Sequence, residues 1–269
     1  MAKDWWKSFF TDSIGEILFE DRANLAVTEV NEILRRTKLR KSATILDVAC
    51  GVGRHSFEFA KHGHNVVGLD YSQSYINTAA RRSSRTPINK RPQFVRGDMR
   101  QLEKAIPAKK FDLAVSLFNS FGYFDKRSDD LKMLKSMARV LQPGGMLIIN
   151  TLNLNGVIHR LIKVPALMDG HGHHTGCELK KNLFFISNAT FDCKKRKTDC
   201  CWTVIDGRKG RSVITKLPFT QNVYSHRELT QMLGKCGFKI KAIWGKLHGT
   251  KFNESTSWHQ TILAQLENS

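Results

Sequence analysis

Residues 43–70 read ATILDVACGVGRHSFEFAKHGHNVVGLD, and the order of residue types in this stretch decides the fold. The apolar run 44–48 is typical of a buried strand, and the small-residue turn 49–53 ends it. Helical spacing follows, and a second apolar run, 65–69, is closed by Asp70. The stretch therefore predicts a βαβ unit, with a ligand crevice at the carboxyl ends of its strands.

The turn and the acid suit a nucleotide-type ligand. Small residues let a ligand approach the backbone, and the following helix presents free N–H groups and a positive dipole end. Asp70 is placed to accept hydrogen bonds from ribose hydroxyls. A dinucleotide fingerprint needs a third glycine, but Gly51 and Gly53 are followed by Ser56 at that position. Asp47 would also lie close to a pyrophosphate, whereas a zwitterionic amino acid with a sulfonium tolerates it, so S-adenosylmethionine is favoured.

The pattern Asp47-x-Ala49-x-Gly51-x-Gly53 resembles the first motif of class I S-adenosylmethionine-dependent methyltransferases, with Ala49 where the usual pattern has Gly. Further matches follow in the family's order: the ribose-binding acid Asp70, the adenine-reading segment 97–99, the fourth strand 111–115 and the turn 141–145. The resemblance covers residues 42–149. It implies a doubly wound, Rossmann-like α/β sheet of seven strands that binds S-adenosyl-L-methionine and releases S-adenosyl-L-homocysteine.

The resemblance also assigns the cofactor to residues at the strand ends. Asp98 is expected to accept the adenine amino hydrogens and Met99 to contact the ring, although Asp98 also suits a helix cap. The residues expected at the cofactor are Trp5, Asp47, Ala49, Gly51, Gly53, Asp70, Tyr71, Asp98, Met99 and Phe118.

The acceptor is expected where the fourth strand ends, at 119–124. This segment reads NSFGYF and lacks the Asn/Asp-Pro-Pro-aromatic tetrad of enzymes that methylate adenine in DNA. A base is needed only if the acceptor must lose a proton before attack, and the candidates are Tyr123 and His159. The candidate substrate contacts, each with a purely structural alternative, are Arg22, Asn119, Ser120 and Arg160.

The pattern divides the chain into four parts. The aromatic residues of 1–41, including Trp5 and Trp6, recur at helical spacing. The resemblance implies that this part is a helical lid; a terminal helix that only packs on the body is the alternative. Residues 42–151 form the cofactor-binding core, 152–224 an antiparallel insertion that covers the substrate, and 225–269 complete the sheet. Small-molecule enzymes, including sugar N-methyltransferases and glycine N-methyltransferase, resemble this plan.

Within the insertion, three strands are expected at 184–188, 200–205 and 212–218. The segment His171-Gly172-His173-His174 is expected to be a polar loop rather than a metal site. The six cysteines include no C-x-x-C pair, so zinc is not expected, and reduced thiols indicate the cytoplasm. No run is long and apolar enough to span a membrane.

The charge of +19 is the unusual feature of the composition. It favours an anionic acceptor or a nucleic acid, or it is dispersed, solvated charge. The predicted function is therefore methyl transfer to nitrogen or oxygen of a small molecule. The alternatives are an RNA methyltransferase and a non-enzymatic ligand-binding protein on the same fold.

Overall fold

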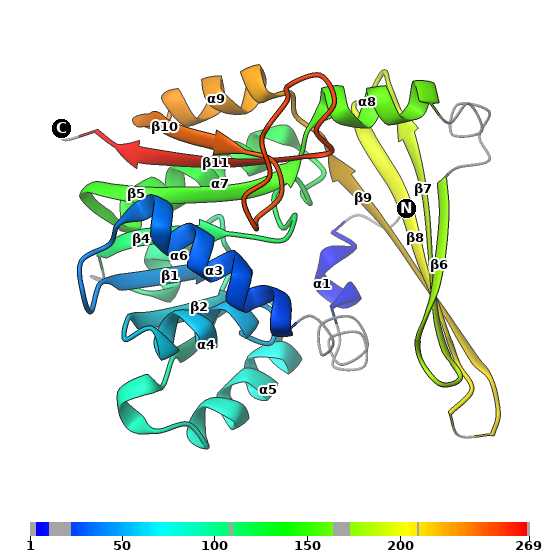
Figure 1. The fold of residues 1–269 in the computed structure, drawn as a ribbon, viewed down its shortest axis with the longest axis horizontal. Coiled ribbons are helices and arrows are strands. Elements are labelled where there is room, and N and C mark those ends of the chain that lie inside the picture. The colour runs from blue at the N-terminus through cyan, green and yellow to red at the C-terminus, as the bar shows by residue number, and fades with distance from the viewer. Residues whose placement is uncertain (1–3, 11–22, 108–109, 164–172, 209, 268–269) are drawn as a thin grey trace.

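The computed structural model describes residues 4–10, 23–107, 110–163, 173–208 and 210–267. Its body is a seven-stranded sheet of order β10-β11-β5-β4-β1-β2-β3 (Figure 1). Strands β1 to β5 run parallel, and β11 runs antiparallel to both of its neighbours, β10 and β5. The strands are β1 (Thr44–Val48), β2 (Asn65–Asp70), β3 (Gln93–Arg96), β4 (Phe111–Ser116), β5 (Leu141–Leu152), β10 (Phe238–Trp244) and β11 (His259–Leu266). This confirms the predicted seven-stranded, doubly wound class.

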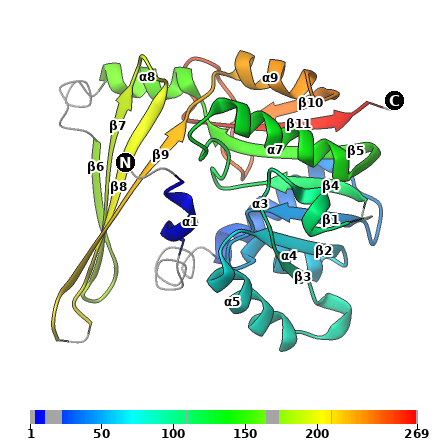
Figure 2. The same ribbon diagram turned by 180° about the vertical axis from the view of Figure 1, so that it is seen from behind.

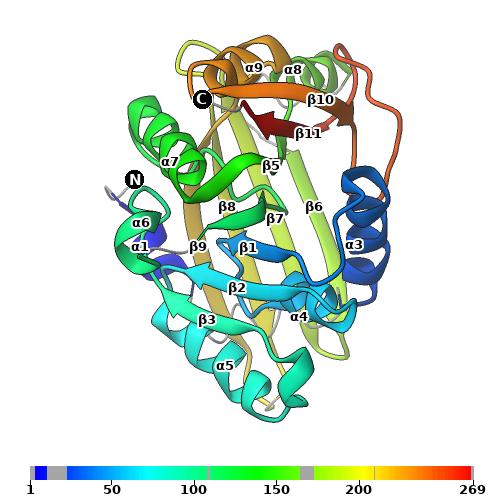
Figure 3. The same cartoon turned by 90° about the vertical axis from the view of Figure 1, so that its left-hand side faces the viewer.

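The two central strands are apolar because both of their faces are covered. Leu46 and Ala114 belong to the core on one face, and Ile45 and Leu113 to the core on the other. Helices α3 (Ala23–Thr37) and α4 (Arg54–Lys61) cover the second face; α6 (Leu102–Ala105), α7 (Arg127–Val140) and α9 (His226–Gly234) cover the first (Figure 3). Helix α5 (Gln73–Ser84) packs on β2 and β3, and a 3₁₀ turn, Ile88–Lys90, precedes β3.

The order of the strands creates the crevice. The chain runs from β1 outward through β2 to β3, and then returns to β4 on the other side of β1. The loops after β1 and β4 therefore leave the sheet in opposite directions, which opens a crevice at the carboxyl ends of these strands.

A second, antiparallel sheet stands across from this crevice. It contains β6 (His173–Lys180), β7 (Leu183–Asp192), β8 (Lys197–Asp206) and β9 (Val213–Asn222), and α8 (Leu154–Lys163) leads into it from β5. The short helix α1 (Trp6–Phe9) lies between the two sheets in both side views (Figures 1 and 2). The insertion and the N-terminal segment thus both face the carboxyl ends of the body strands.

The insertion differs from the sequence prediction in its number of strands. Four strands are present rather than three, and β7, β8 and β9 each have 10 residues. The additional strand, β6, begins at His173, so the expected polar loop at 171–174 is wrong for its second half, and His171 and Gly172 lie outside the described residues. β6 contains glycine and polar residues, so it has no apolar pattern that would predict a strand. Its order comes from backbone pairing with β7.

Hydrogen bonds of buried side chains fix the insertion to the body. The Asn222 side chain donates to the Phe124 carbonyl, at 2.7 Å, and to the Asp130 carboxylate, at 2.8 Å. The Tyr224 hydroxyl donates to the same carboxylate at 2.6 Å. Strand β9 is therefore held against the segment between β4 and α7. Among the described helices, none has the length and apolar character needed to cross a bilayer.

Candidate functional site

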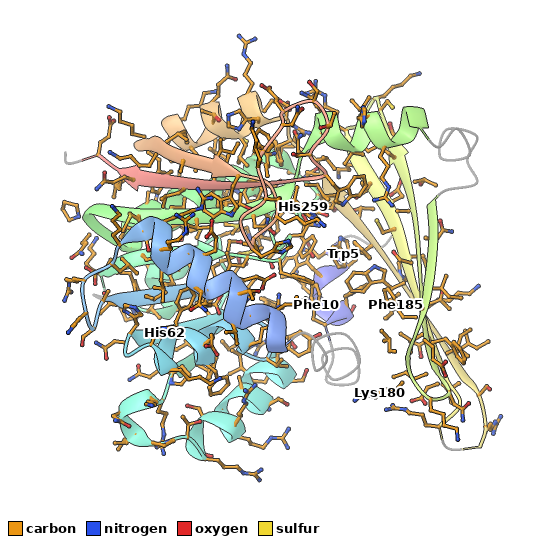
Figure 4. All side chains as sticks on the ribbon, viewed as in Figure 1. Trp5, Phe10, His62, Lys180, Phe185 and His259 are labelled. Atoms are coloured by element: carbon orange, nitrogen blue, oxygen red, sulfur yellow. The ribbon has the colours of Figure 1, made fainter. Side chains whose placement is uncertain are left out.

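A cavity of ≈ 440 Å³ lies at the carboxyl ends of β1, β2 and β4. Its far walls are aromatic: Trp6 and Phe10 come from the N-terminal segment, and Trp202 and Phe219 come from the insertion. Figure 4 shows Phe10 and His259 at this end of the body sheet, facing the insertion. Most of the residues predicted from the sequence meet here, namely Asp47, Ala49, Gly51, Asp70, Tyr71, Asp98, Met99, Phe118, Asn119, Ser120 and Tyr123.

The turn after β1 has a backbone that favours glycine. Ala49, Gly51 and Gly53 all have positive φ, at 59°, 57° and 82°. A Cβ placed on Gly51 would have Tyr75 as its nearest neighbour, at 4.0 Å, so it would project into the open cavity. The turn therefore offers a bare stretch of backbone to a ligand.

Asp70 is fixed at the end of β2 by two backbone donors. Its carboxylate accepts the Gly51 N–H at 2.8 Å and the Ser72 N–H at 2.9 Å. Burial raises the pKa of this carboxyl to about 6, in spite of these hydrogen bonds. A carboxylate held in this way keeps acceptor capacity for a ligand hydroxyl.

Asp47 lies beneath the turn. The Ser56 hydroxyl donates to its carboxylate at 2.6 Å, and burial raises the pKa of the carboxyl. Burial also raises the pKa of the neighbouring Cys50 thiol, as do the charges of Asp47 and Asp70. The thiol is therefore a neutral group that lines the cavity rather than a nucleophile.

Asp98 combines a place at the cavity with the contacts of a turn residue. It lines the cavity, and it also accepts the Arg100 backbone N–H at 2.9 Å, as a turn residue does. The Arg100 guanidinium pairs with Asp98 at 2.6 Å and lies over the Phe124 ring, 4.5 Å from its centroid. Because the same guanidinium lies 5.4 Å from the Trp6 centroid, it connects the acid of the cavity to the N-terminal helix.

The loop after β4 has a strained backbone and is held by side-chain hydrogen bonds. Phe118 and Asn119 both have positive φ, at 55° and 66°. The Asn119 side chain accepts the Leu152 N–H at 3.0 Å and donates to the Gln221 side chain at 2.8 Å. Asn119 therefore holds the loop against β5 and β9, which favours its structural alternative over a substrate contact. The Ser120 hydroxyl similarly donates to a carbonyl of its own loop, at 2.9 Å.

Tyr123 presents a neutral hydroxyl at this cavity. Its ring packs edge-on against Trp5, with centroids 5.1 Å apart. Burial raises the pKa of the hydroxyl well above its ordinary value. In the described part of the chain no side chain or backbone group hydrogen bonds to this hydroxyl, so it is available to a ligand as a donor, and its raised pKa opposes a role as a base.

Several expected residues lie elsewhere. Trp5 is buried behind the wall, and its neighbour Trp6 lines the cavity instead. Gly53 is the N-cap of α4, where an added Cβ would lie 2.5 Å from the Phe94 ring, so it serves helix packing.

The candidates on α8 also lie away from the cavity. His159 and Arg160 do not line the cavity, because α8 packs its apolar side on the base of the insertion through Leu154 and Val157. The Arg160 guanidinium lies over the Trp258 ring, 4.9 Å from its centroid. Arg22 lies outside the described residues.

The cavity also contains a buried ionic group that was not predicted from the sequence. Glu29 of α3 contacts His55 at 2.7 Å and Arg54 at 3.3 Å, and all three side chains are buried. Burial opposes ionisation of Glu29, but the hydrogen bond and charge of His55 and the charge of Arg54 outweigh it and lower its pKa. The Arg54 guanidinium lies 4.5 Å from the Phe118 ring centroid. Arg54 and His55 directly follow the glycine turn, and this position was a signal that could have identified them. Nothing in the sequence pointed to Glu29.

The loop between β10 and β11 supplies a second missed group. Lys246, Leu247 and His248 line the cavity together with His259 at the start of β11. Burial, aided by the charge of Lys246, lowers the pKa of His259 to about 4, so its ring is neutral. These residues form no sequence motif and reach the site only because β10 and β11 complete the sheet beside β5. In the described residues no His, Cys, Asp and Glu side chains form a group able to hold a metal ion.

Comparison with known proteins agrees with this geometry. Residues 45–145 match a family described as a methyltransferase domain. A putative methyltransferase of Bacillus subtilis, YqeM, is 25% identical over 221 residues, which are 76% of this chain and 77% of that protein. An N,N-dimethyltransferase of Streptomyces venezuelae that acts on dTDP-3-amino-3,4,6-trideoxy-α-D-glucopyranose is 28% identical over 136 residues, and the match spans 50% of this chain and about half, 54%, of that protein.

Among crystal structures, an S-adenosylmethionine-dependent methyltransferase from Clostridium acetobutylicum ATCC 824 superposes with a TM-score of 0.75. The superposition covers 95% of this chain and 97% of the other, at 17% identity. At that identity the similarity concerns the fold, and it includes the insertion as well as the body.

Proposed function

Because this chain is, by its domain and its fold, a class I S-adenosylmethionine-dependent methyltransferase, we propose that it methylates an amine or hydroxyl of a small molecule held between the body and the insertion. The observation that carries the proposal is the single cavity that contains both the Asp70 and Gly51 unit and the aromatic wall of the insertion. A donor site and an acceptor site side by side in one cavity are what direct methyl transfer requires.

The residues of the cavity fit the parts of S-adenosylmethionine. Gly51 leaves room beside the turn, Asp70 keeps acceptor capacity for ribose hydroxyls, and Asp98 with Met99 suits the adenine. The pair of Glu29 and Arg54 offers one negative and one positive group to the amino-acid end. When bound, the cofactor supplies an electrophilic methyl group.

The acceptor side of the cavity orients the acceptor and excludes water. Trp202 and Phe219 present apolar faces, and Tyr123 presents a hydroxyl donor. Bonds from Gln221 to the Asn119 loop keep these walls at a fixed separation. A neutral amine attacks without prior loss of a proton, so it needs no side-chain base, and the raised pKa of Tyr123 makes an amine the better candidate than an alcohol.

The RNA alternative is less well supported by this geometry. A polynucleotide needs an open, basic groove that follows its backbone. Here the acceptor side is walled by Trp202 and Phe219 from the insertion and by Phe10 from the N-terminal segment. The cavity therefore favours a compact acceptor.

Two measurements test the proposal. Calorimetry with S-adenosylmethionine and S-adenosylhomocysteine examines the cofactor site, with NAD as the contrasting ligand. Formation of S-adenosylhomocysteine is then followed with panels of amino sugars, small aliphatic amines and phenols. Binding of both cofactor forms together with turnover of an amine is expected; binding of NAD in their place, or turnover only with RNA, would overturn the proposal.

A further inference from the structure

We propose that the acceptor carries an acidic group, a carboxylate or a phosphate, which binds to the Lys246 ammonium at the rim of the cavity. This inference rests on the proposed function, and it names a class of acceptor and a residue that selects it. It follows from how the loop after β10 is built, from the distribution of charge around the cavity, and from the groups that the cofactor leaves unused.

The loop after β10 is rigid at the point where it meets the cavity. The Gly245 N–H donates to the Thr250 carbonyl at 2.7 Å, and the Lys246 N–H donates to the Thr250 hydroxyl at 2.8 Å. The Thr261 hydroxyl of β11 donates to the Gly245 carbonyl at 2.7 Å. These bonds close a tight turn and fix it to the sheet, so the direction in which its side chains leave is set by the fold.

Leu247 anchors the same turn from the inside. Its side chain is buried in the core between the sheet and α3, and the Trp244 indole donates to its carbonyl at 3.4 Å. Gly249 has a φ of 97°, and an added Cβ there would lie 2.7 Å from a Glu32 carboxylate oxygen. With Leu247 directed into the core, its exposed neighbours Lys246 and His248 are held at the cavity.

The acids at the cavity have positions or partners of their own. The carboxylates of Asp47, Asp70 and Asp98 lie at the ends of β1, β2 and β3, and Glu29 is paired with Arg54 and His55. In the Lys246 loop, the charge of His248 acts on Glu29, but no carboxylate of the described residues forms an ion pair with Lys246. An ammonium that lines a cavity without a counter-charge favours an anionic ligand.

The cofactor does not account for this ammonium. The expected partners of its ribose, adenine and amino-acid groups are Asp70, Asp98 and the Glu29–Arg54 pair. Lys246 has none of these assignments, and it lies near His259 on β11, beside β5. The acceptor is therefore the ligand that is left for Lys246, and an acidic substituent on it would fix the orientation of its nucleophile.

The first test measures binding of simple anions to the protein loaded with S-adenosylhomocysteine. Inorganic phosphate and acetate are titrated separately, and the resonance of the Lys246 ammonium is followed by NMR in protein with labelled lysines, with Lys246→Gln used to assign it. We expect saturable binding of at least one anion at Lys246 and its loss in Lys246→Gln. The two anions distinguish a phosphate from a carboxylate acceptor, and no saturable effect from either would overturn the inference.

Lys251→Gln is the matched control, because Lys251 is an exposed lysine of the same loop that does not line the cavity. It should bind both anions as the unchanged protein does. Affinity for S-adenosylhomocysteine should be the same in all three proteins. Failure of S-adenosylhomocysteine to bind at all would instead contradict the proposed function, so the two failures are distinguishable.

The second test uses pairs of amines that differ only in an acidic group. Glucosamine 6-phosphate is compared with glucosamine, and 3-aminobenzoate with aniline, in binding to the same loaded protein. The acidic member should bind about 1.5- to fivefold more tightly, which is the range for an exposed ion pair. Lys246→Glu should reverse the preference. An equal preference in the unchanged protein and in Lys246→Glu would overturn the inference.

Discussion

The Asp70 carboxylate accepts a hydrogen bond from the Gly51 N–H at 2.8 Å, which joins the end of β2 to the turn after β1. The acid and the glycine lie 19 residues apart in the chain but act as one unit at the cavity. Because the same carboxylate accepts the Ser72 N–H, its position is fixed before any ligand binds.

Asp70→Asn should therefore weaken binding of S-adenosylmethionine by about 1–3 kcal/mol, the cost of leaving buried polar groups without a partner. The amide keeps the size of the side chain, but it offers one oxygen where the carboxylate offers two. Calorimetry on the folded variant provides the measurement. Asp192→Asn, on the insertion and outside the cavity, is the control, and an unchanged affinity in Asp70→Asn would remove this residue from the cofactor site.

Affinity for S-adenosylmethionine should also fall as the pH is lowered through about 6, the raised pKa of Asp70. Below that pH the free protein holds a proton on Asp70, and binding through the carboxylate must release it. The affinity should then decrease by up to about tenfold for each pH unit. Titrations between pH 5 and 8, as the working range, should show this slope in the unchanged protein and a flatter curve in Asp70→Asn. A steeper or equal slope in the variant would assign the titration to another group.

Gly51→Val should abolish cofactor binding, because the added side chain projects into the open cavity beside the turn. Gly63→Val is a matched control: Gly63 also has a positive φ, and a Cβ there meets nothing within 4 Å. Both variants carry the same kind of backbone strain, of about 1–2 kcal/mol. Loss of binding in Gly51→Val alone would separate the steric effect from the strain, whereas equal loss in both would show that strain is responsible.

The parts of the fold that could be predicted from the sequence are those that local pattern determines. The strand, turn and acid within 43–70 follow from residue types at fixed spacing, and they correctly locate β1, β2 and Asp70. Strand β6 could not be found in the same way, because its order depends on pairing with β7 rather than on its own residues.

The site shows the same division between local and tertiary information. Asp70, Asp98 and Tyr123 follow directly from strand ends and line the cavity. Glu29 and Lys246 come from a helix before the body strands and a loop after them, and only the folded sheet brings them together. His159 follows β5 in sequence but does not line the cavity, because a residue that follows a strand can still turn away from the strand's end.

Trp6→Phe should weaken cofactor binding and remove most of the change in tryptophan fluorescence on adding S-adenosylmethionine, because Trp6 lines the cavity and packs on Tyr71 with centroids 4.7 Å apart. Trp5→Phe should leave both largely intact, since Trp5 lies behind the wall. Both residues are buried in the same core, so a loss of packing would affect them similarly. A fluorescence change lost in Trp5→Phe and retained in Trp6→Phe would contradict the assignment.

Asp130 is buried, and the Tyr224 hydroxyl donates to its carboxylate at 2.6 Å. Burial raises the pKa of Asp130 to about 6, while the bonds from Tyr224 and Asn222 lower it. Since the folded protein binds this proton more tightly than the unfolded chain, the contribution of Asp130 to stability is greatest in acid and decreases as the pH rises through about 6. Above that pH the buried carboxylate depends on its donors.

Tyr224→Phe removes one of these donors and should cost about 1–3 kcal/mol of unfolding free energy when Asp130 is ionised. The cost should be smaller near pH 4.5, about one and a half units below the pKa of about 6, where the carboxyl is protonated and needs fewer donors. Denaturant unfolding at the two pH values measures the difference. Phe121→Leu, which changes a buried ring that packs on Tyr224 without touching the hydrogen bond, should cost the same at both. A loss in Tyr224→Phe that does not depend on pH would show that the hydroxyl contributes packing rather than support for the charge that fastens β9 to the body.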